Sequence, residues 1–172
     1  LYDRLGPDDP LVATVEHSAE RAVDTIRHLL SFARGSEGAR HDVSPFDLLD
    51  EVERIVDVTF PRTIDIEVER PASLPLVRAD ANQLHQVLVN LCVNARDAMP
   101  EGGRLRIEAE TRNVDAEAIA RGEAPAALEP GRFVVFHVED TGRGIAEEHQ
   151  LQIFEPFFST KPADEGTGLG LA

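Results

Sequence analysis

The chain contains a single cysteine, Cys92, among its 172 residues. One thiol can form neither a disulfide nor a zinc site within the chain, and its place in an apolar run predicts a small core residue. Basic residues are also scarce, since 17 Lys and Arg stand against 32 Asp and Glu and give a formal net charge of −15. Because phosphate backbones attract basic surfaces, this balance excludes nucleic acid as a general partner.

Long hydrophobic runs are missing as well. No stretch approaches the ~18 consecutive apolar residues of a membrane span, and no signal peptide is visible. We therefore expect a cytoplasmic chain whose parent protein reaches a membrane, if at all, only through parts that are absent here. The hydrophobic content of 42% nevertheless supports one domain with a real core, or one domain with an appendage.

Residues 11–33 show the apolar spacing of a long helix. Steps of four and three place one stripe along it, which is typical of the seam of a coiled coil or four-helix bundle. The stripe consists of Leu11, Val15, Ala19, Ala22, Ile26, Leu29 and Ala33. Because the chain offers no partner helix, we expect a homodimer through helix 11–33. The alternative is that the stripe packs on the chain's own sheet.

The rest of the chain alternates between helix and strand patterns. Ser44 followed by Pro45 predicts the start of one helix, and Asp80 with Gln83 predicts a capping box for another over 80–99. The expected core face of this second helix is Leu84, Val87, Leu88, Leu91 and Ala95. Strands are expected at 63–70, 104–112 and 132–140, a surface insertion with a short helix at 114–131, and a short helix at 147–154.

These elements predict an α+β fold. We expect a two-layer α/β sandwich with a mixed, largely antiparallel sheet, helices on one face, and the long helix in front of it in the sequence.

Four short motifs follow one another in the second half of the chain. They are HQVLVNLCVNARDAM (85–99), VEDTGRGI (138–145), FEPFFSTK (154–161) and GTGLGLA (166–172). In this order they resemble the N, G1, F and G2 boxes of the ATP-binding catalytic domain of bacterial sensor histidine kinases. The wider group also contains gyrase-type, mismatch-repair and heat-shock-chaperone ATPases. The glycine-rich motif is not a Walker P-loop, which would need Gly-Lys-Ser/Thr, and the chain has no HRD or DFG of eukaryotic-type protein kinases.

In the first motif, Asn90 and Asn94 lie four residues apart and share a helix face. Magnesium prefers oxygen ligands and needs only one or two protein groups beside the phosphates. The resemblance implies that Asn94 is the Mg²⁺ ligand and that Asn90 assists at the phosphates or the metal, which makes both catalytic candidates. Arg96 is a candidate phosphate contact. Asp97 departs from the family, which often has a basic residue there, and is left without a role.

Position 90 also separates functions within the group. Hydrolytic relatives carry a glutamate at the position of Asn90, where it activates the attacking water. An amide cannot act as a general base. Asn90 therefore favours transfer to a protein acceptor over rapid ATP hydrolysis.

The second motif follows an apolar strand and places Asp140 before Gly142 and Gly144. A carboxylate that accepts from an exocyclic amine selects adenine over guanine, which presents a carbonyl at that position. The resemblance implies this role for Asp140, and the two glycines allow the backbone to pass close to the base.

The last two motifs are expected to form a mobile loop that closes over ATP. The three phenylalanines of the F box would anchor this loop, and Lys161 could reach the phosphates as a point charge. A glycine-rich turn before a helix start offers backbone N–H groups to an anion. The candidate ATP-binding residues in this turn are Gly166, Thr167, Gly168, Leu169 and Gly170.

The chain lacks a phosphoacceptor in the expected context. None of the six histidines sits on a helix before an acid, as the acceptor of the family does. By resemblance, residues 1–38 are the end of the dimerisation and phosphotransfer hairpin, with its second helix at 11–33. Residues 39–172 are then an ATP-binding domain truncated at its C-terminal end. We expect this fragment to bind ATP but not to autophosphorylate alone.

The resemblance implies a two-component sensor histidine kinase. Its γ-phosphoryl group would pass from ATP to a histidine absent from this chain and then to an aspartate on a response-regulator receiver domain. Three alternatives remain: a hydrolytic ATPase, an anti-sigma-type serine kinase, and a non-catalytic dimerisation and docking module with a vestigial pocket. Asn90 counts against the first, the seam at 11–33 against the second, and the intact Asn94 and Asp140 against the third.

Overall fold

The computed structural model describes residues 39–161, 168, 170 and 171. These residues fall into two compact units, one formed by 39–151 with Leu171 and the other by the described part of 152–170. The helix predicted over 11–33, and with it the expected dimer surface, lies outside the described residues, as do Gly166, Thr167 and Leu169.

Two helices begin at the predicted caps. Helix α2 (Pro45–Thr59) starts after Ser44, whose hydroxyl accepts the Asp47 N–H at 3.3 Å. Helix α3 (Ala81–Ala98) starts after Asp80, whose carboxylate accepts backbone N–H groups of the first turn at 2.9 and 3.2 Å. Each cap satisfies donors that have no partner inside the helix, so these two boundaries were predictable from local sequence.

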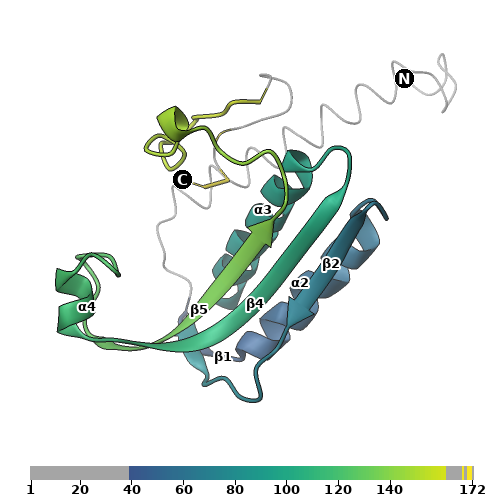
Figure 1. Cartoon of the computed structure of the whole chain (residues 1–172). Coiled ribbons are helices and arrows are strands. Elements are labelled where there is room, and N and C mark those ends of the chain that lie inside the picture. The colour runs from purple at the N-terminus through teal and green to yellow at the C-terminus, as the bar shows by residue number, and fades with distance from the viewer. Residues whose placement is uncertain (1–38, 162–167, 169, 172) are drawn as a thin grey trace, which may run out of the picture. The chain divides into compact units, whose positions relative to one another are not determined.

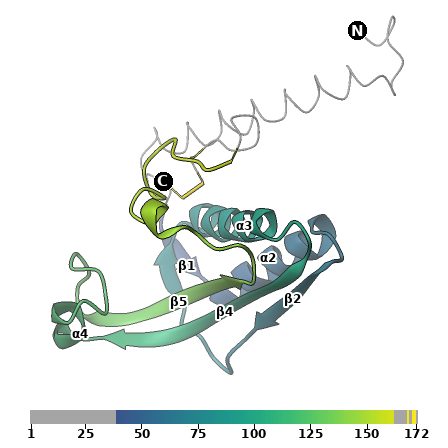
Figure 2. The same ribbon diagram turned by 45° about the horizontal axis from the view of Figure 1, so that its top comes forward.

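A mixed three-stranded sheet packs against these helices. Strand β2 (Ile64–Glu69) runs parallel to β4 (Gly103–Val114), and β4 runs antiparallel to β5 (Gly131–Asp140), in the order β2-β4-β5. A separate antiparallel pair joins β1 (His41–Val43) to β3 (Val77–Ala79). Figures 1 and 2 show α2 and α3 together on one face of the sheet. The predicted α+β two-layer fold is therefore confirmed.

The core lies between these two layers. It takes Leu49 and Val52 from α2, Cys92 from α3, and Leu105 and Ile107 from β4, all with no exposed surface. Burial raises the pKa of the Cys92 thiol to about 11, because the thiolate would lose its water. Cys92 is thus the core residue that its apolar surroundings predicted.

Three details differ from the sequence-based expectations. Val87, predicted in the core face of α3, is 54% exposed, because the buried side of this helix is centred on Leu88, Cys92 and Ala95. The helix expected at 147–154 is only the 3-10 turn Glu147–His149. The apolar Leu151 next to it is 91% exposed, so no core contact extends the turn. The short helix expected within 114–131 is present as α4 (Ala116–Ala120).

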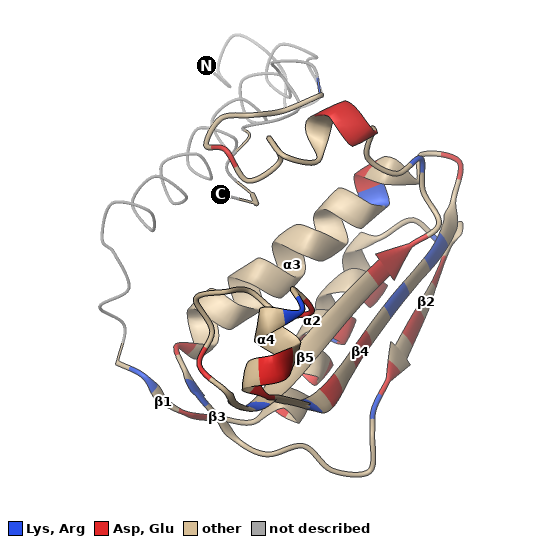
Figure 3. Cartoon of the chain, turned by 60° about the vertical axis from the view of Figure 1, so that its left-hand side comes forward, with Lys and Arg blue, Asp and Glu red and all other residues tan. Residues whose placement is uncertain are grey.

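The outer face of the sheet carries charge. Figure 3 shows Lys/Arg and Asp/Glu positions along β2 and β4. Arg104 lies 3.5 Å from Glu67, and Arg106 contacts Glu69, Glu108 and Glu139 at 2.7 to 3.5 Å. Among the described residues, no helix has the length and apolar character needed to cross a membrane.

Candidate nucleotide-binding site

The two asparagines of the first motif lie on α3, within residues 39–151. Asn90 and Asn94 are both half-buried and share one face of the helix. The core face, with Leu88, Cys92 and Ala95, lies on the other side. The helix is thus anchored through one face and presents two amide groups on another.

The second motif forms a turn directly after β5. Asp140 is the last residue of β5 and is paired in register with Leu105. Its Oδ1 accepts the Gly142 backbone N–H at 2.8 Å. This hydrogen bond fixes the orientation of the carboxylate and engages only one of its two oxygens.

This turn contacts the C-terminal end of α3. The Arg143 N–H donates to the Ala98 carbonyl at 3.1 Å. A Cβ atom added to Gly142 would lie 2.6 Å from the Ala98 oxygen and 2.7 Å from Asp140 Oδ1. Gly142 is therefore required by close packing against Ala98, a reason that the sequence did not suggest. The contact joins the asparagine-bearing helix to the aspartate-bearing turn.

Thr141 fixes the same turn to the start of β4 through hydrogen bonds with Arg104. Its Oγ1 accepts the Arg104 N–H at 2.9 Å and lies 3.7 Å from Met99 Sδ, to which it donates. Its own N–H donates to the Arg104 carbonyl at 3.2 Å. Neither Thr141 nor Met99 was singled out from the sequence. The sequence carried no signal for either residue, because Thr141 meets Arg104 and Met99 across 37 and 42 positions of the chain.

Arg96 is held by neighbours within the same unit. Its guanidinium donates to Asp97 Oδ1 through Nε at 3.0 Å and through Nη2 at 2.8 Å. Its Cζ lies 5.4 Å from the centroid of the Phe60 ring, just after α2. Arg96 thus compensates the charge of Asp97, the residue that departs from the family pattern, and Phe60 is a contact that the sequence did not suggest.

The F box belongs to the second unit. Phe157 has a positive φ of 69°, and its N–H donates to the Gly168 carbonyl at 2.8 Å. Gly168 has φ +63°, and a Cβ there would lie 2.3 Å from the Phe157 carbonyl carbon. The side chains of Phe154 and Phe157 are 66% and 68% exposed. The F box and the glycine-rich motif are therefore joined through backbone contacts, while Lys161 and Gly170 are also described in this unit.

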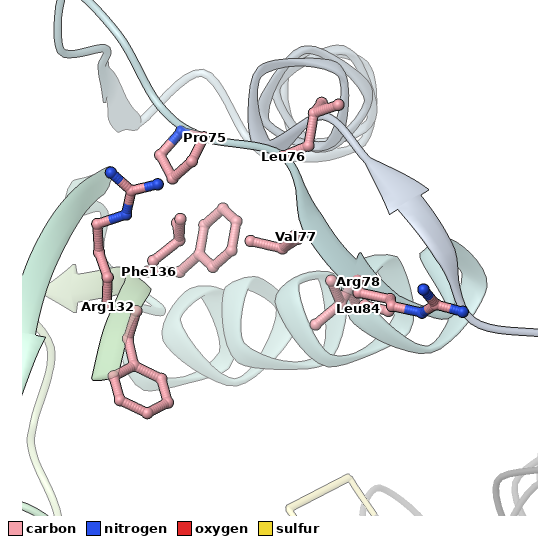
Figure 4. Close-up of a pocket in the computed structure, with 10 residues that line it drawn as sticks. Pro75, Leu76, Val77, Arg78, Leu84, Arg132 and Phe136 are labelled. Atoms are coloured by element: carbon pink, nitrogen blue, oxygen red, sulfur yellow. The ribbon is translucent and has the colours of Figure 1, made fainter. Parts of the chain in front are cut away.

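Two hollows of about 400 Å³ lie elsewhere, against β5. One is lined by Pro75, Leu76, Val77, Leu84, Arg132 and Phe136, among others (Figure 4). The second is lined by Val87 and Leu91 of α3 and by residues around α4. Neither hollow is lined by the predicted ATP-binding residues Asn90, Asn94 or Asp140.

The sequence of residues 79–172 matches a known family. The model of the histidine kinase-, DNA gyrase B- and HSP90-like ATPases matches residues 79–172. The chain belongs to this family. The match begins just before α3 and includes all four motifs.

Several proteins that are similar to this chain are sensor histidine kinases. Sensor kinase CckA of Brucella abortus (strain 2308) is 38% identical over 169 residues, which are 96% of this chain and 17% of that protein. The structure of full-length ShkA in complex with AMPPNP has a TM-score of 0.71 at 26% identity and covers 97% of this chain and 33% of that one. These matches confirm the prediction of an ATP-binding catalytic domain of the sensor histidine kinase type.

A third match concerns an assembly. Histidine kinase ThkA in complex with response regulator protein TrrA has a TM-score of 0.64 at 22% identity, over 91% of this chain and 43% of that one. At this identity the likeness shows the shared fold alone. The chain spans only 17% of CckA and 33% of ShkA.

The residues of this ATPase domain fit a magnesium ion held mainly by nucleotide. Within the part of the chain that the structure describes, His, Cys, Asp and Glu form no cluster of three that could hold a metal alone. Asn90 and Asn94 instead offer neutral amide oxygens, and Mg²⁺ accepts one or two protein oxygens beside phosphates and waters. The donor set therefore suits a metal that arrives with ATP.

Proposed function

We propose that the chain binds Mg-ATP between the Asn90/Asn94 face of α3 and the Asp140–Gly144 turn. In the parent protein, the γ-phosphoryl group passes to a histidine and then to an aspartate of a response-regulator receiver domain. The observation that carries this proposal is the direct contact between the two elements. The Ala98 carbonyl at the end of α3 accepts the Arg143 N–H at 3.1 Å, so the metal-binding and base-binding groups have one shared support.

Asp140 supplies the selection of adenine. Since Oδ1 already accepts the Gly142 N–H at 2.8 Å, the second carboxylate oxygen is the one that receives the 6-amino group. Guanine presents a carbonyl oxygen at that position, which a carboxylate repels. Gly142 and Gly144 let the backbone run close to the base, and at Gly144 φ is +67°.

Asn90 and Asn94 act at the phosphate end. Asn94 holds the ion through its amide oxygen, and Asn90 orients the phosphates or the ion. When bound, Mg²⁺ offsets the phosphate charge. From the sequence motifs we also propose that Lys161 and the glycine-rich segment 166–170, with Thr167 and Leu169, act on the phosphates by adding a point charge and backbone N–H donors.

Transfer to a protein is favoured over hydrolysis by the amide at position 90. No general base stands there to activate water. The acceptor imidazole is itself a nucleophile, so the domain contributes by holding the nucleotide in position and balancing charge. We further propose that the segment 11–33 forms a helix and dimerises the protein beside its phosphotransfer helix.

Ligand-induced stabilisation tests the nucleotide site. At a concentration of 100 Kd, Mg-ADP should add about 2.7 kcal/mol to the stability of the chain. Since 1 kcal/mol moves Tm by about 2–4 °C at this size, the expected shift is roughly 5–10 °C. Mg-GDP should give a far smaller shift, because Asp140 repels the guanine carbonyl.

Three variants sharpen the test. Asp140→Ala should abolish the shift with ADP. ADP in EDTA, which removes Mg²⁺, should give a smaller Tm shift than Mg-ADP. Asn94→Ala should abolish only this difference between the two shifts, because Asn94 holds the ion. Asn82→Ala, an exposed asparagine in the first turn of α3, should behave as wild type. Absence of any shift in the unmodified chain would contradict the proposal and favour a docking module.

A further inference from the structure

The structure gives Arg96 two defined partners, the carboxylate of Asp97 and the ring of Phe60. Its guanidinium makes two hydrogen bonds to Asp97 Oδ1, at 3.0 and 2.8 Å. Its Cζ also stands 5.4 Å from the centre of the Phe60 ring. A guanidinium within about 6 Å of a ring centroid gains a cation–π attraction. Arg96 would have to lose its contacts with both Asp97 and Phe60 before it could turn towards a ligand.

These contacts act on the last turn of α3. Phe60 follows α2, whereas Arg96 and Asp97 precede Ala98, the last residue of α3. Phe60 is only 9% exposed and belongs to the core cluster, so it offers Arg96 a fixed surface. The arginine therefore ties the end of α3 to the end of α2 through an aromatic ring that the core holds in place.

The turn that carries Asp140 rests on this same end of α3. The Ala98 carbonyl accepts the Arg143 N–H at 3.1 Å, and Gly142 has no room for a Cβ beside Ala98. The Gly142 N–H in turn fixes Asp140 Oδ1 at 2.8 Å. A displacement of the last helical turn therefore moves the Asp140 carboxylate.

We propose that Arg96 is a positioning residue, which acts through Phe60, Asp97 and Ala98 to hold the Asp140–Gly144 turn in its nucleotide-binding geometry. It does not contact the phosphates. The inference rests on the proposed nucleotide site and changes the expectation from the sequence, where Arg96 was a candidate phosphate contact. Asp97 then has a role as well, since it orients the guanidinium and its charge is compensated.

Amide hydrogen exchange tests this inference without a ligand. Loss of a cation–π contact of this kind should raise the equilibrium constant for local opening of the turn by a factor of about two to five. Arg96→Ala and Phe60→Leu should each speed exchange of the Arg143 N–H by that factor. The Ile66 N–H, in β2, should be unchanged. Unchanged exchange at Arg143 in both variants would overturn the inference.

Nucleotide binding separates positioning from phosphate contact. Adenosine, which has no phosphate, and Mg-ADP are titrated into each variant at a temperature where it is fully folded. Arg96→Ala and Phe60→Leu should weaken both ligands by the same two- to five-fold factor, about that of the lost contact. The double variant should be no weaker than Arg96→Ala, because both changes remove one interaction. Arg96→Lys should be intermediate, since a lysine keeps the charge over Phe60 but not the fork to Asp97.

A matched control is Arg112→Ala, which removes the same charge from an arginine paired with Glu110 on β4. It should leave both affinities unchanged. A phosphate contact would instead weaken Mg-ADP alone in Arg96→Ala and leave Phe60→Leu as wild type, which would overturn the inference. Unchanged affinities in Arg96→Ala would do the same. Failure of the unmodified chain to bind either ligand would refute the nucleotide site itself. The exchange experiment, which needs no ligand, would still test whether Arg96 and Phe60 hold the Asp140–Gly144 turn.

Discussion

The substitution Gly142→Ala offers the sharpest test of how the site is built. A methyl group there would meet the Ala98 oxygen at 2.6 Å, the Ala98 Cβ at 2.7 Å and Asp140 Oδ1 at 2.7 Å. Two of these atoms belong to a helix end that the core anchors, so relief requires movement of α3 or of the turn.

The magnitude follows from two contributions. Overpacking of a tight contact costs about 1–3 kcal/mol. The displaced turn would also weaken the hydrogen bonds from Arg143 to Ala98 and from Gly142 to Asp140, each worth about 1 kcal/mol. We expect the free energy of unfolding to fall by about 2–4 kcal/mol, and Tm by roughly 5–15 °C. Affinity for Mg-ADP should fall with it, because the Asp140 carboxylate loses its orientation.

Urea denaturation and calorimetric titration measure these two effects. Gly122 and Gly144 serve as controls for stability, and Gly122 alone serves for binding, because Gly144 belongs to the proposed nucleotide-binding turn. Gly144 and Gly122 have φ of +67° and +76°, and an added Cβ would meet no atom within 4 Å at either position. Gly144→Ala and Gly122→Ala should therefore cost only the strain of a left-handed alanine, about 1–2 kcal/mol. If Gly142→Ala destabilises the chain no more than these controls and binds Mg-ADP normally, the packing argument is wrong.

Three further predictions concern other parts of the chain. The buried Cys92 thiol, with its pKa raised to about 11, should resist alkylation at pH 8 in the native chain and react at the rate of unfolding, as followed by mass spectrometry with and without urea. The hydrogen bond and the positive charge of Arg106 lower the pKa of Glu69 from its ordinary value, so this pair should add stability above the ordinary pKa of a glutamate and lose it as the pH falls through the lowered pKa. Acid titration of Glu69→Gln should show a shallower loss of stability than wild type. Gly168→Ala, whose Cβ would overlap the Phe157 backbone at 2.3 Å, should weaken Mg-ADP in calorimetric titration, and an unchanged affinity would exclude a role for this contact.

The parts that the sequence predicted well depend on neighbours along the chain. Ser44 and Asp80 cap their helices through N–H groups two or three residues away, so a short window contains the whole interaction. The strand at 63–70 and the one at 132–140 follow from their own apolar runs. The asparagine pair on α3 shares a face by helix periodicity alone.

The parts that the sequence did not predict depend on distant residues. Strand β1 has three residues and exists because His41–Val43 meets Val77–Ala79. Phe60 and Arg96 are brought together by the packing of α2 on α3, and Thr141 meets Arg104 through the pairing of β4 with β5. The exposure of Val87 also depends on tertiary packing. Cys92 and Met99 in the core fix how α3 is rotated about its own axis, and this rotation leaves Val87 exposed. Local pattern cannot specify such contacts, since each requires the final arrangement of the layers.

The net charge of −15 poses a question for a chain that binds a triphosphate. Many of the acids on the sheet are paired, as Glu67 and Glu69 are with Arg104 and Arg106. These pairs lie on the outer face of the sheet, opposite the helices, and at physiological salt charges are largely screened beyond a Debye length of about 8 Å. On the helix side, Asp97 is compensated by Arg96, and the proposed ligand groups Asn90 and Asn94 are neutral. The field at the phosphates is therefore set by these local groups and by the cation that accompanies the nucleotide. For this reason, adding acids to the outer face of the sheet should leave affinity for Mg-ADP nearly unchanged.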